Sequence, residues 1–155
     1  MKRAVDRVLA VSAWLRLLHA YGVVERELRR AVAVHCTFPQ FDVLNQLDRE
    51  PGGLTFVELS RRLLVTAGNL TGIVDRLQDE RLVRRTVHPD DRRAFRLTLT
   101  AKGRRLIRRA QQRHHRALAA LLGDVTQHDL RTLRRLLGRL RTSASARVGK
   151  AGTRR

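Results

Sequence analysis

The sequence predicts a mainly α-helical chain with one small β-hairpin, in which helices from the two ends of the chain hold two copies together. Three observations lead to this fold class. Apolar residues recur at alternating spacings of three and four through residues 5–33 and again through 101–142, which is the period of amphipathic helices. Residues 54–79 hold two short helical patterns joined by a tight turn. Residues 82–99 then hold two strand patterns around a turn-forming segment.

The charge of the chain points to a polyanionic partner. Its 155 residues carry 33 Lys and Arg against 14 Asp and Glu, a formal net charge of +19. Each phosphate that a cation neutralises releases counterions, so double-stranded DNA is the expected partner. We expect no run long and apolar enough to span a bilayer, no membrane partner and no cofactor. The single cysteine, Cys36, excludes an internal disulfide and is compatible with a cytoplasmic, nucleoid-associated protein.

The first predicted element is a long helix over residues 5–33, within a dimerisation segment 1–36. Two apolar stripes share it, one through Val8, Val11, Leu15 and Leu18 and the other through Trp14, Leu17, Tyr21, Val24 and Leu28. A single small domain seldom buries a helix that is apolar around most of its circumference, so we favour a helix shared with a partner subunit. An ordinary core helix is the alternative.

A second helix is predicted from residue 37, at the start of a lobe that extends to residue 100. Thr37-Phe-Pro-Gln40 has the pattern of a capping box with proline in the first turn, and the apolar residues continue to Leu47. Pro51-Gly52-Gly53 ends this helix.

The tandem helices that follow have the pattern of a DNA-reading unit. Thr55-Phe-Val-Glu58 is another capping box, and Thr66 is expected to cap the second helix through the amide near Asn69. The second helix buries Leu70, Ile73, Val74 and Leu77, which leaves small and polar residues outside, where they can approach base edges. These outward residues are Ala67, Gly68, Asn69, Thr71, Gly72, Asp75 and Arg76. An amphipathic helix with a solvated face would explain Asn69 or Thr71 singly, but not the tandem arrangement.

Two strands, 82–87 and 95–99, flank a turn that is rich in arginine. The turn, His88-Pro89-Asp90-Asp91-Arg92-Arg93, has the proline and aspartates of a hairpin tip. An arginine on such a tip can enter a narrow minor groove, and we assign this contact to Arg93, steadied by Asp91. A solvated basic turn is an equal alternative for this loop taken alone.

These residues together resemble the MarR family of winged helix-turn-helix transcriptional regulators. The resemblance rests on the run from Leu59 to Leu77, on Asp90-Asp-Arg-Arg93 and on Leu97-Thr-Leu-Thr-Ala-Lys-Gly103. It implies a homodimer on a pseudo-palindromic operator, with one recognition helix per subunit in the major groove. The DNA-binding residues that it implies are Ser60, Arg61, Thr66, Gly68, Asn69, Thr71, Arg76, Arg92 and Arg93. The chain departs from the family at Arg81, where glycine is usual, so we expect either a strained left-handed cap or another turn.

The C-terminal part is predicted as two dimerisation helices over residues 101–142 and a basic tail without regular structure over 143–155. Thr126-Gln-His-Asp129 opens the second helix as a capping box. Arginines crowd the outer face of the first helix, and we interpret them as a solvated surface that attracts DNA at long range. These arginines are Arg104, Arg105, Arg108, Arg109, Arg113 and Arg116.

The resemblance also implies a small-molecule effector, frequently an aromatic acid, bound between the dimer helices and the DNA-binding lobe. The residues that we expect near it are Trp14, Arg16, His19, His35, Phe38 and Phe41. Core packing, surface ion pairing and ordinary hydrogen bonding are the alternatives for each one. Redox sensing by Cys36 beside His35 is a weaker hypothesis, and metal binding by His114 and His115 is weaker still.

The sequence is compatible with two functions. The first is a sequence-specific dimeric repressor whose affinity for DNA falls when an effector binds. The second is a constitutive basic protein that coats DNA, motivated by the charge of +19. An enzyme is not expected, because we find no nucleophile with a base partner, no phosphate-binding glycine loop and no metal-ligand cluster in the sequence.

Overall fold

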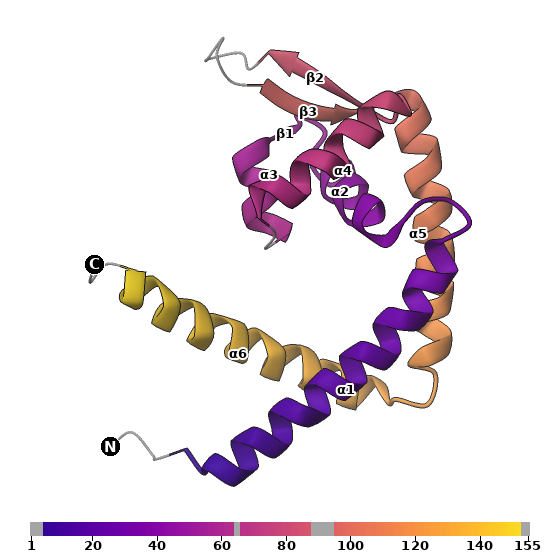
Figure 1. The fold of residues 1–155 in the computed structure, drawn as a ribbon. Helices are drawn as coiled ribbons and strands as arrows, with labels where there is room; N and C mark the ends of the chain where they lie inside the picture. The colour runs from indigo at the N-terminus through magenta and orange to yellow at the C-terminus, as the bar shows by residue number, and fades with distance from the viewer. Residues whose placement is uncertain (1–4, 64–65, 88–94, 153–155) are drawn as a thin grey trace. The chain divides into compact units, whose positions relative to one another are not determined.

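The structure is a computed structural model that describes residues 5–63, 66–87 and 95–152 (Figure 1). The chain divides after Leu118 into two compact units, 1–118 and 119–155. The elements of the first unit are α1 (Arg7–Val32), α2 (Phe38–Asp48), β1 (Leu54–Thr55), α3 (Phe56–Leu63), α4 (Ala67–Asp79), β2 (Val83–Val87), β3 (Phe95–Leu99) and most of α5 (Ala101–Leu121). The second unit holds the end of α5 and α6 (Gln127–Gly152). The predicted mainly α-helical fold with a small β-hairpin is confirmed. The assembly of two copies stays a prediction. The predicted domain boundaries stay predictions.

Helix starts are fixed by local side chains, as the sequence indicates. At α2 the Gln40 amide donates to Thr37 Oγ1 at 3.4 Å, and the Thr37 amide donates to Gln40 Oε1 at 3.0 Å. At α3 the Thr55 amide donates to Glu58 Oε2 at 2.8 Å, and the Glu58 amide donates to Thr55 Oγ1 at 3.2 Å. Both reciprocal capping boxes are therefore confirmed.

The sheet has three antiparallel strands in the order β1-β3-β2. Its register pairs Leu54 with Leu97 and Val83 with Leu99, which places these four leucine and valine side chains in the core. Gly53, at φ 82°, precedes β1 and lies so close to β3 that a Cβ there would be 2.7 Å from Leu97 O. The third strand was not predicted, since two residues carry no detectable period.

One core joins α2, α3, α4, the sheet and the first half of α5. Its largest fully buried side chains are Leu44, Leu47, Leu54, Leu59, Leu70, Leu77, Leu82 and Ile107. Of the four residues predicted for the inward face of the second tandem helix, Leu70, Val74 and Leu77 are fully buried, and Ile73 is half-buried against the core. This core fixes the orientation of α4 and so determines which of its residues face outward.

The apolar surface of α1 is largely uncovered within the chain. Val8, Val11, Trp14, Leu15 and Leu18 are each more than two-fifths exposed. By length and composition alone α1 could cross a membrane, because its most apolar stretch has a mean hydropathy of 1.3 and is unburied. The expectation from the sequence that no stretch is long and apolar enough to span a bilayer was therefore wrong. The finding is weak evidence for a span, since a helix shared between subunits has the same composition.

The helix α6 extends further than expected. We expected no regular structure from Ser143, but the helix continues to Gly152, so that expectation was wrong over residues 143–152. The physical reason is that Ala144, Ala146 and Arg147 are strong helix formers, and propensity continues a helix that has already been nucleated. Exposed leucines also run along α6, namely Leu133, Leu136, Leu137 and Leu140.

Candidate nucleic-acid interface

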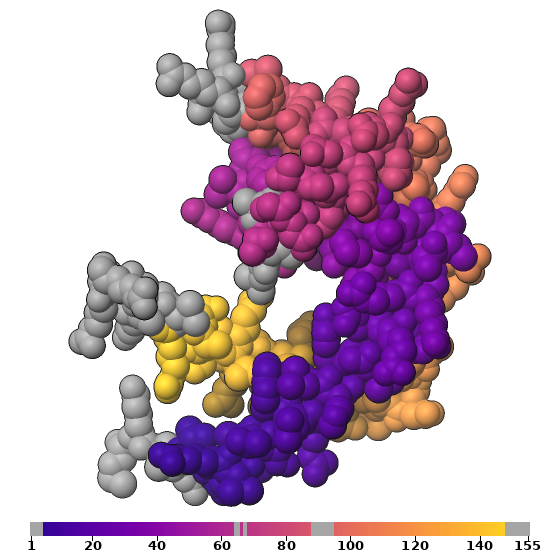
Figure 2. All heavy atoms as spheres, in the orientation of Figure 1, coloured from indigo at the N-terminus to yellow at the C-terminus, as the bar shows by residue number. Residues whose placement is uncertain are grey.

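The outward face of α4 is small and polar. Gly68, Asn69, Thr71, Gly72 and Arg76 are all exposed, while the opposite face of the helix is buried. In the space-filling view, α4 and the wing strands form one continuous surface of the lobe (Figure 2). Four of these residues, namely Gly68, Asn69, Thr71 and Arg76, are predicted DNA contacts. The structure brings them onto one accessible face, and their contacts with DNA stay predictions.

The two glycines of this face, Gly68 and Gly72, have open space beside them among the described residues. A Cβ built on Gly68 or Gly72 would meet no atom within 4 Å, and neither residue has a left-handed φ. Glycine inside a helix costs about 1 kcal/mol relative to alanine. Because the described residues leave open space beside both glycines, the backbone of this face is accessible to close approach by another molecule.

The first turn of α4 differs from the sequence-based expectation. Thr66 has the extended backbone of an N-cap, but its side chain makes no capping hydrogen bond, so the predicted cap was wrong. The Thr66 carbonyl still accepts the Leu70 amide at 3.1 Å. Within the described residues, the amides of the first turn therefore lack the side-chain acceptor that Thr37 and Thr55 provide for α2 and α3.

The C-terminal end of α4 is closed by a Schellman motif that contains Arg81. The Leu82 amide donates to Leu77 O and the Arg81 amide donates to Gln78 O, both at 2.8 Å. Arg81 has φ 56°, the left-handed conformation that usually favours glycine. Of the two outcomes expected for Arg81, the structure has the left-handed cap. Leu77 and Leu82 are both fully buried beneath it, which fixes the motif.

Residues at the start of α5 fasten this end of α4. Thr100 Oγ1 donates to Arg81 O at 2.7 Å, and Lys102 Nζ donates to Glu80 O at 2.8 Å. Gly103 packs directly on the same turn, because a Cβ there would lie 2.1 Å from Leu82 O. The Thr-Ala-Lys-Gly run quoted for the family resemblance thus joins α5 to the end of α4. Sequence reasoning did not assign this role to Lys102 or Gly103.

The wing is linked to α4 by an ion pair. Arg85 Nη2 on β2 lies 3.3 Å from Asp75 Oδ1 on α4, and both side chains are about half exposed. Such a pair contributes little to stability in water, but it holds the base of the wing against the outer face of the helix. Asp91, Arg92 and Arg93, which we assigned to the wing tip, lie outside the described residues.

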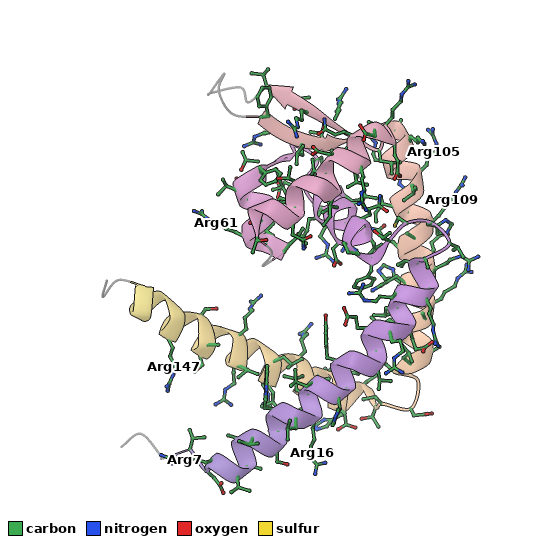
Figure 3. All side chains as sticks on the ribbon, viewed as in Figure 1. Arg7, Arg16, Arg61, Arg105, Arg109 and Arg147 are labelled. Atoms are coloured by element: carbon green, nitrogen blue, oxygen red, sulfur yellow. The ribbon has the colours of Figure 1, made fainter. Side chains whose placement is uncertain are left out.

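The remaining basic residues occupy separate surfaces. Arg61 on α3 is exposed and projects away from the lobe, whereas Ser60 is half-buried (Figure 3). Arg105 and Arg109 project from the outer side of α5 (Figure 3). Their role in DNA attraction stays a prediction.

A pocket of about 240 Å³ lies beside α4. It is lined by Tyr21, Glu25 and Arg29 of α1, Phe38, Pro39 and Asp42 of α2, Leu63 of α3, and Asn69 and Ile73 of α4. Of the expected effector residues, only Phe38 is part of this wall. Phe41 is buried and stacks on His114 at a centroid distance of 4.9 Å. Trp14, Arg16 and His19 lie further along α1, and His35 follows that helix. The effector role expected for Trp14, Arg16, His19, His35 and Phe41 stays a prediction.

The charges of this pocket interact with one another. Arg29 binds Glu25 Oε1 through Nη2 at 2.7 Å and through Nε at 3.2 Å, and its guanidinium lies 4.9 Å from the centre of the Phe38 ring. Burial raises the pKa of the Asp42 carboxyl, which Arg29 partly offsets. Burial and the adjacent Glu25 raise the pKa of Tyr21. The spacing of four residues between Glu25 and Arg29 is a sequence pattern from which their ion pair could have been predicted, but the sequence analysis did not use it.

Cys36 lies in an environment unlike that of a reactive thiol. It is buried, and burial together with Glu80 and Asp42 raises the pKa of its thiol to about 11. The weaker hypothesis of redox sensing relied on His35 to favour the thiolate, but burial and acidic neighbours determine the pKa of this thiol. Among the described residues, no group of three metal-ligating side chains occurs.

Comparison with known proteins gives relatives across most of the chain. A profile described as MarR family matches residues 37–94. An HTH-type transcriptional repressor of Mycobacterium tuberculosis is 33% identical over 126 residues, which cover 80% of this chain and 90% of the repressor. The transcriptional activatory protein BadR of Rhodopseudomonas palustris is 33% identical over 151 residues, which cover 93% of this chain and 85% of BadR.

Solved structures share the fold. A MarR variant from E. coli, complexed with operator DNA, has a TM-score of 0.75 and 27% identity, covering 88% of this chain and 99% of that one. The PcaV transcriptional regulator from Streptomyces coelicolor, in complex with its natural ligand, has a TM-score of 0.69 and 27% identity, covering 92% of this chain and 99% of that one. These relatives are regulators of transcription rather than enzymes.

Proposed function

The chain belongs to the MarR family of transcriptional regulators, and from this premise we propose that it is a sequence-specific repressor. It binds a pseudo-palindromic operator as a homodimer in the cytoplasm, with α4 of each subunit in one of two successive major grooves. A small molecule lowers its affinity for this operator.

The observation that carries this proposal is the outer face of α4. Gly68 and Gly72 leave room for close approach, and Asn69 and Thr71 stand between them on the exposed side of the helix. Asparagine forms two hydrogen bonds with the major-groove edge of adenine, so Asn69 supplies base discrimination, while Arg76 supplies a cation for phosphate. The E. coli relative bound to operator DNA supports the same use of this fold.

Dimer formation follows from surfaces that one chain leaves uncovered. Exposed apolar residues run along α1 and separately along α6. Monomeric proteins seldom expose so many large apolar side chains in rows, and a two-fold dimer buries the same patch of both copies.

Repression is proposed over activation from the likeness to the M. tuberculosis repressor, of which this chain covers 90%. The likeness to BadR favours activation as the second candidate. A promoter fused to the bound site distinguishes the two directions, because its output rises on deletion of a repressor gene and falls on deletion of an activator gene.

Operator selection from random duplexes, followed by competition at physiological salt, tests specific binding. We expect the selected palindrome to be bound roughly 10³-fold or more tightly than a scrambled duplex. A ratio below about tenfold would favour the second function, a basic protein that coats DNA without specificity.

Substitutions at two predicted contacts test what α4 and the wing each contribute to DNA affinity and base preference. Asn69→Ala should weaken binding and relax preference at one base pair, whereas Arg93→Ala should weaken binding by on the order of 1–3 kcal/mol. Arg105→Ala, on the outer side of α5, is the control for loss of charge alone. An unchanged preferred site in Asn69→Ala would exclude the assigned base contact.

A further inference from the structure

The pocket beside α4 has an electrostatic character opposite to that of the chain. The whole chain carries a net charge of +19, yet the charged residues lining this pocket are two acids, Glu25 and Asp42, and one base, Arg29. The wall therefore holds one more negative charge than positive charge when all three are ionised. An acidic site within so basic a chain favours a cationic ligand over an anionic one.

Arg29, the cation that an acidic ligand would need, is already engaged. Two of its nitrogens bind Glu25 Oε1, and its guanidinium lies over the Phe38 ring. A carboxylate ligand would either displace Glu25 from this arrangement or bind the remaining nitrogen, Nη1, and in both cases it would lie near two like charges, Glu25 and Asp42. The geometry disfavours an aromatic acid, which was the class expected from the family resemblance.

Asp42 is the acceptor that a cationic ligand would find free. Within the described part of the chain, no residue donates a hydrogen bond to its carboxylate, although it is half-buried in the pocket wall. A half-buried carboxylate without a donor is stabilised when an ammonium group supplies both charge and hydrogen bonds. Burial already raises the pKa of Asp42, which is the expected sign for a carboxyl that lacks such a partner.

The other walls fit the apolar body of such a ligand. Tyr21 and Phe38 provide aromatic faces, and Leu63 and Ile73 provide aliphatic ones. Aromatic faces also attract cations directly. A volume of about 240 Å³ accommodates a ligand of one aromatic ring with a short side chain.

We propose that this pocket binds a small aromatic amine in its protonated form, with the ammonium group between Glu25 and Asp42 and the ring against Tyr21 and Phe38. The inference rests on the proposed function in one respect, namely that the pocket serves an effector. Asn69 and Ile73 of α4 form part of the same wall. The bound amine therefore contacts the helix that reads DNA, and Asn69 is shared between ligand and operator.

Three probes of similar size test the ligand class on the intact protein without DNA. Phenethylamine, phenethyl alcohol and phenylacetate share one ring and differ in the charge of the side chain. Titration calorimetry should show phenethylamine binding about tenfold or more tightly than either of the others, as expected for one added favourable charge interaction. Equal affinities, or tighter binding of phenylacetate, would overturn the proposal.

Two variants and one control test whether Asp42 and Glu25 are the charges that bind the ammonium group. Asp42→Asn should remove most of the preference for the amine. Glu25→Gln should remove that preference and also release Arg29, so that phenylacetate then binds more tightly than it does to the wild-type protein. Glu27→Gln removes the same charge from α1 at a residue paired with Arg30 outside the pocket, and it should leave all three affinities unchanged. A loss in Glu27→Gln equal to that in Glu25→Gln would show a general charge effect and overturn the assignment.

Thermal unfolding of each variant separates loss of binding from loss of fold. The operator competition is measured independently on the same preparations. Specific DNA binding with no amine preference would refute the ligand class and leave the proposed repressor intact. An amine preference without specific DNA binding would retain the ligand site and refute the repressor.

Discussion

At the scale of single residues, Gly72 offers a direct test of why α4 is small on its outer side. Gly72→Ala should raise the free energy of unfolding by up to about 1 kcal/mol, since alanine is the better helix former and its Cβ meets nothing within 4 Å. The same variant should bind the operator less tightly, because the methyl group prevents close approach. Denaturant unfolding and operator titration measure the two effects, and a stable variant with unchanged affinity would contradict the close contact.

His114 should make the stability of the fold depend on pH. Burial, with a smaller contribution from His115, lowers the pKa of His114 below 6.5, and its Nδ1 is buried without a hydrogen-bond partner among the described residues. The folded chain therefore prefers neutral His114. Its stabilising contribution is present above pH 6.5 and decreases as the pH falls below that value, because the unfolded chain then binds the proton more readily.

His114→Phe should reduce this dependence while keeping a ring stacked on Phe41. Urea unfolding of the wild type and the variant at several pH values between about 7 and 5 measures the difference. A variant whose stability falls with pH as steeply as that of the wild type would show that His114 is not the responsible group.

Cys36 should behave as an inert core thiol. With the pKa of the thiol at about 11, very little thiolate exists at neutral pH, and the side chain is buried. Ellman's reagent should therefore react with the native protein at least about tenfold more slowly than with free cysteine, and at an ordinary rate in denaturant. Rapid modification of native protein, with loss of operator binding that Cys36→Ser prevents, would restore the oxidant-sensing hypothesis.

At the scale of elements, the join between α4 and α5 should depend on the absence of a side chain at Gly103. Gly103→Ala places a methyl group against Leu82 O and should lower the free energy of unfolding by about 2 kcal/mol or more. Gly72→Ala is the matched control, since it is the same substitution inside a helix with open space. If Gly103→Ala were as stable as Gly72→Ala, the close packing of α5 on this turn would be wrong.

Elements whose signals are local could be predicted from the sequence, and contacts between distant segments could not. The capping boxes at Thr37 and Thr55 lie within four residues, so they marked helix starts reliably. Strand β1 has two residues and exists through its pairing with β3, more than forty residues later. The predicted Thr66 cap shows the limit of a local pattern, because the residue is in place and its hydrogen bond is not.

The candidate site likewise has one part that could be predicted from a local sequence pattern and one part that depends on contacts between distant segments. The outward face of α4 follows from one helical period. Six of the residues predicted for it are exposed, namely Gly68, Asn69, Thr71, Gly72, Asp75 and Arg76. The walls of the pocket come from four helices, so only Phe38 was anticipated, and Asp42 and Tyr21 were not. A residue's own neighbours in the sequence give no indication of which distant helix will face it.

At the scale of the whole molecule, DNA binding should require the second copy of the chain. Leu15 and Leu18 are exposed on α1, at 49% and 44%. Leu15→Glu combined with Leu18→Glu should yield a monomer by light scattering, with the winged lobe still folded. Operator affinity should fall at least about tenfold, since a monomer engages only one half-site.

Val57→Glu, at an exposed apolar residue of α3, is the control for adding charge to an apolar surface. It should leave the dimer intact. A double variant of α1 that remains dimeric, or a monomer that binds the full operator with wild-type affinity, would contradict this arrangement of subunits.

The two ends of α4 are held unequally, and this has a consequence for how such proteins diverge. Arg81, Thr100 and Lys102 secure the C-terminal end. Among the described residues, no side chain caps the first-turn amides at Thr66. In the proposed complex a phosphate oxygen of the operator would supply the missing acceptor for that turn. New operator preferences can therefore evolve through substitutions in the first turn, while the anchored end preserves the inherited geometry of the lobe.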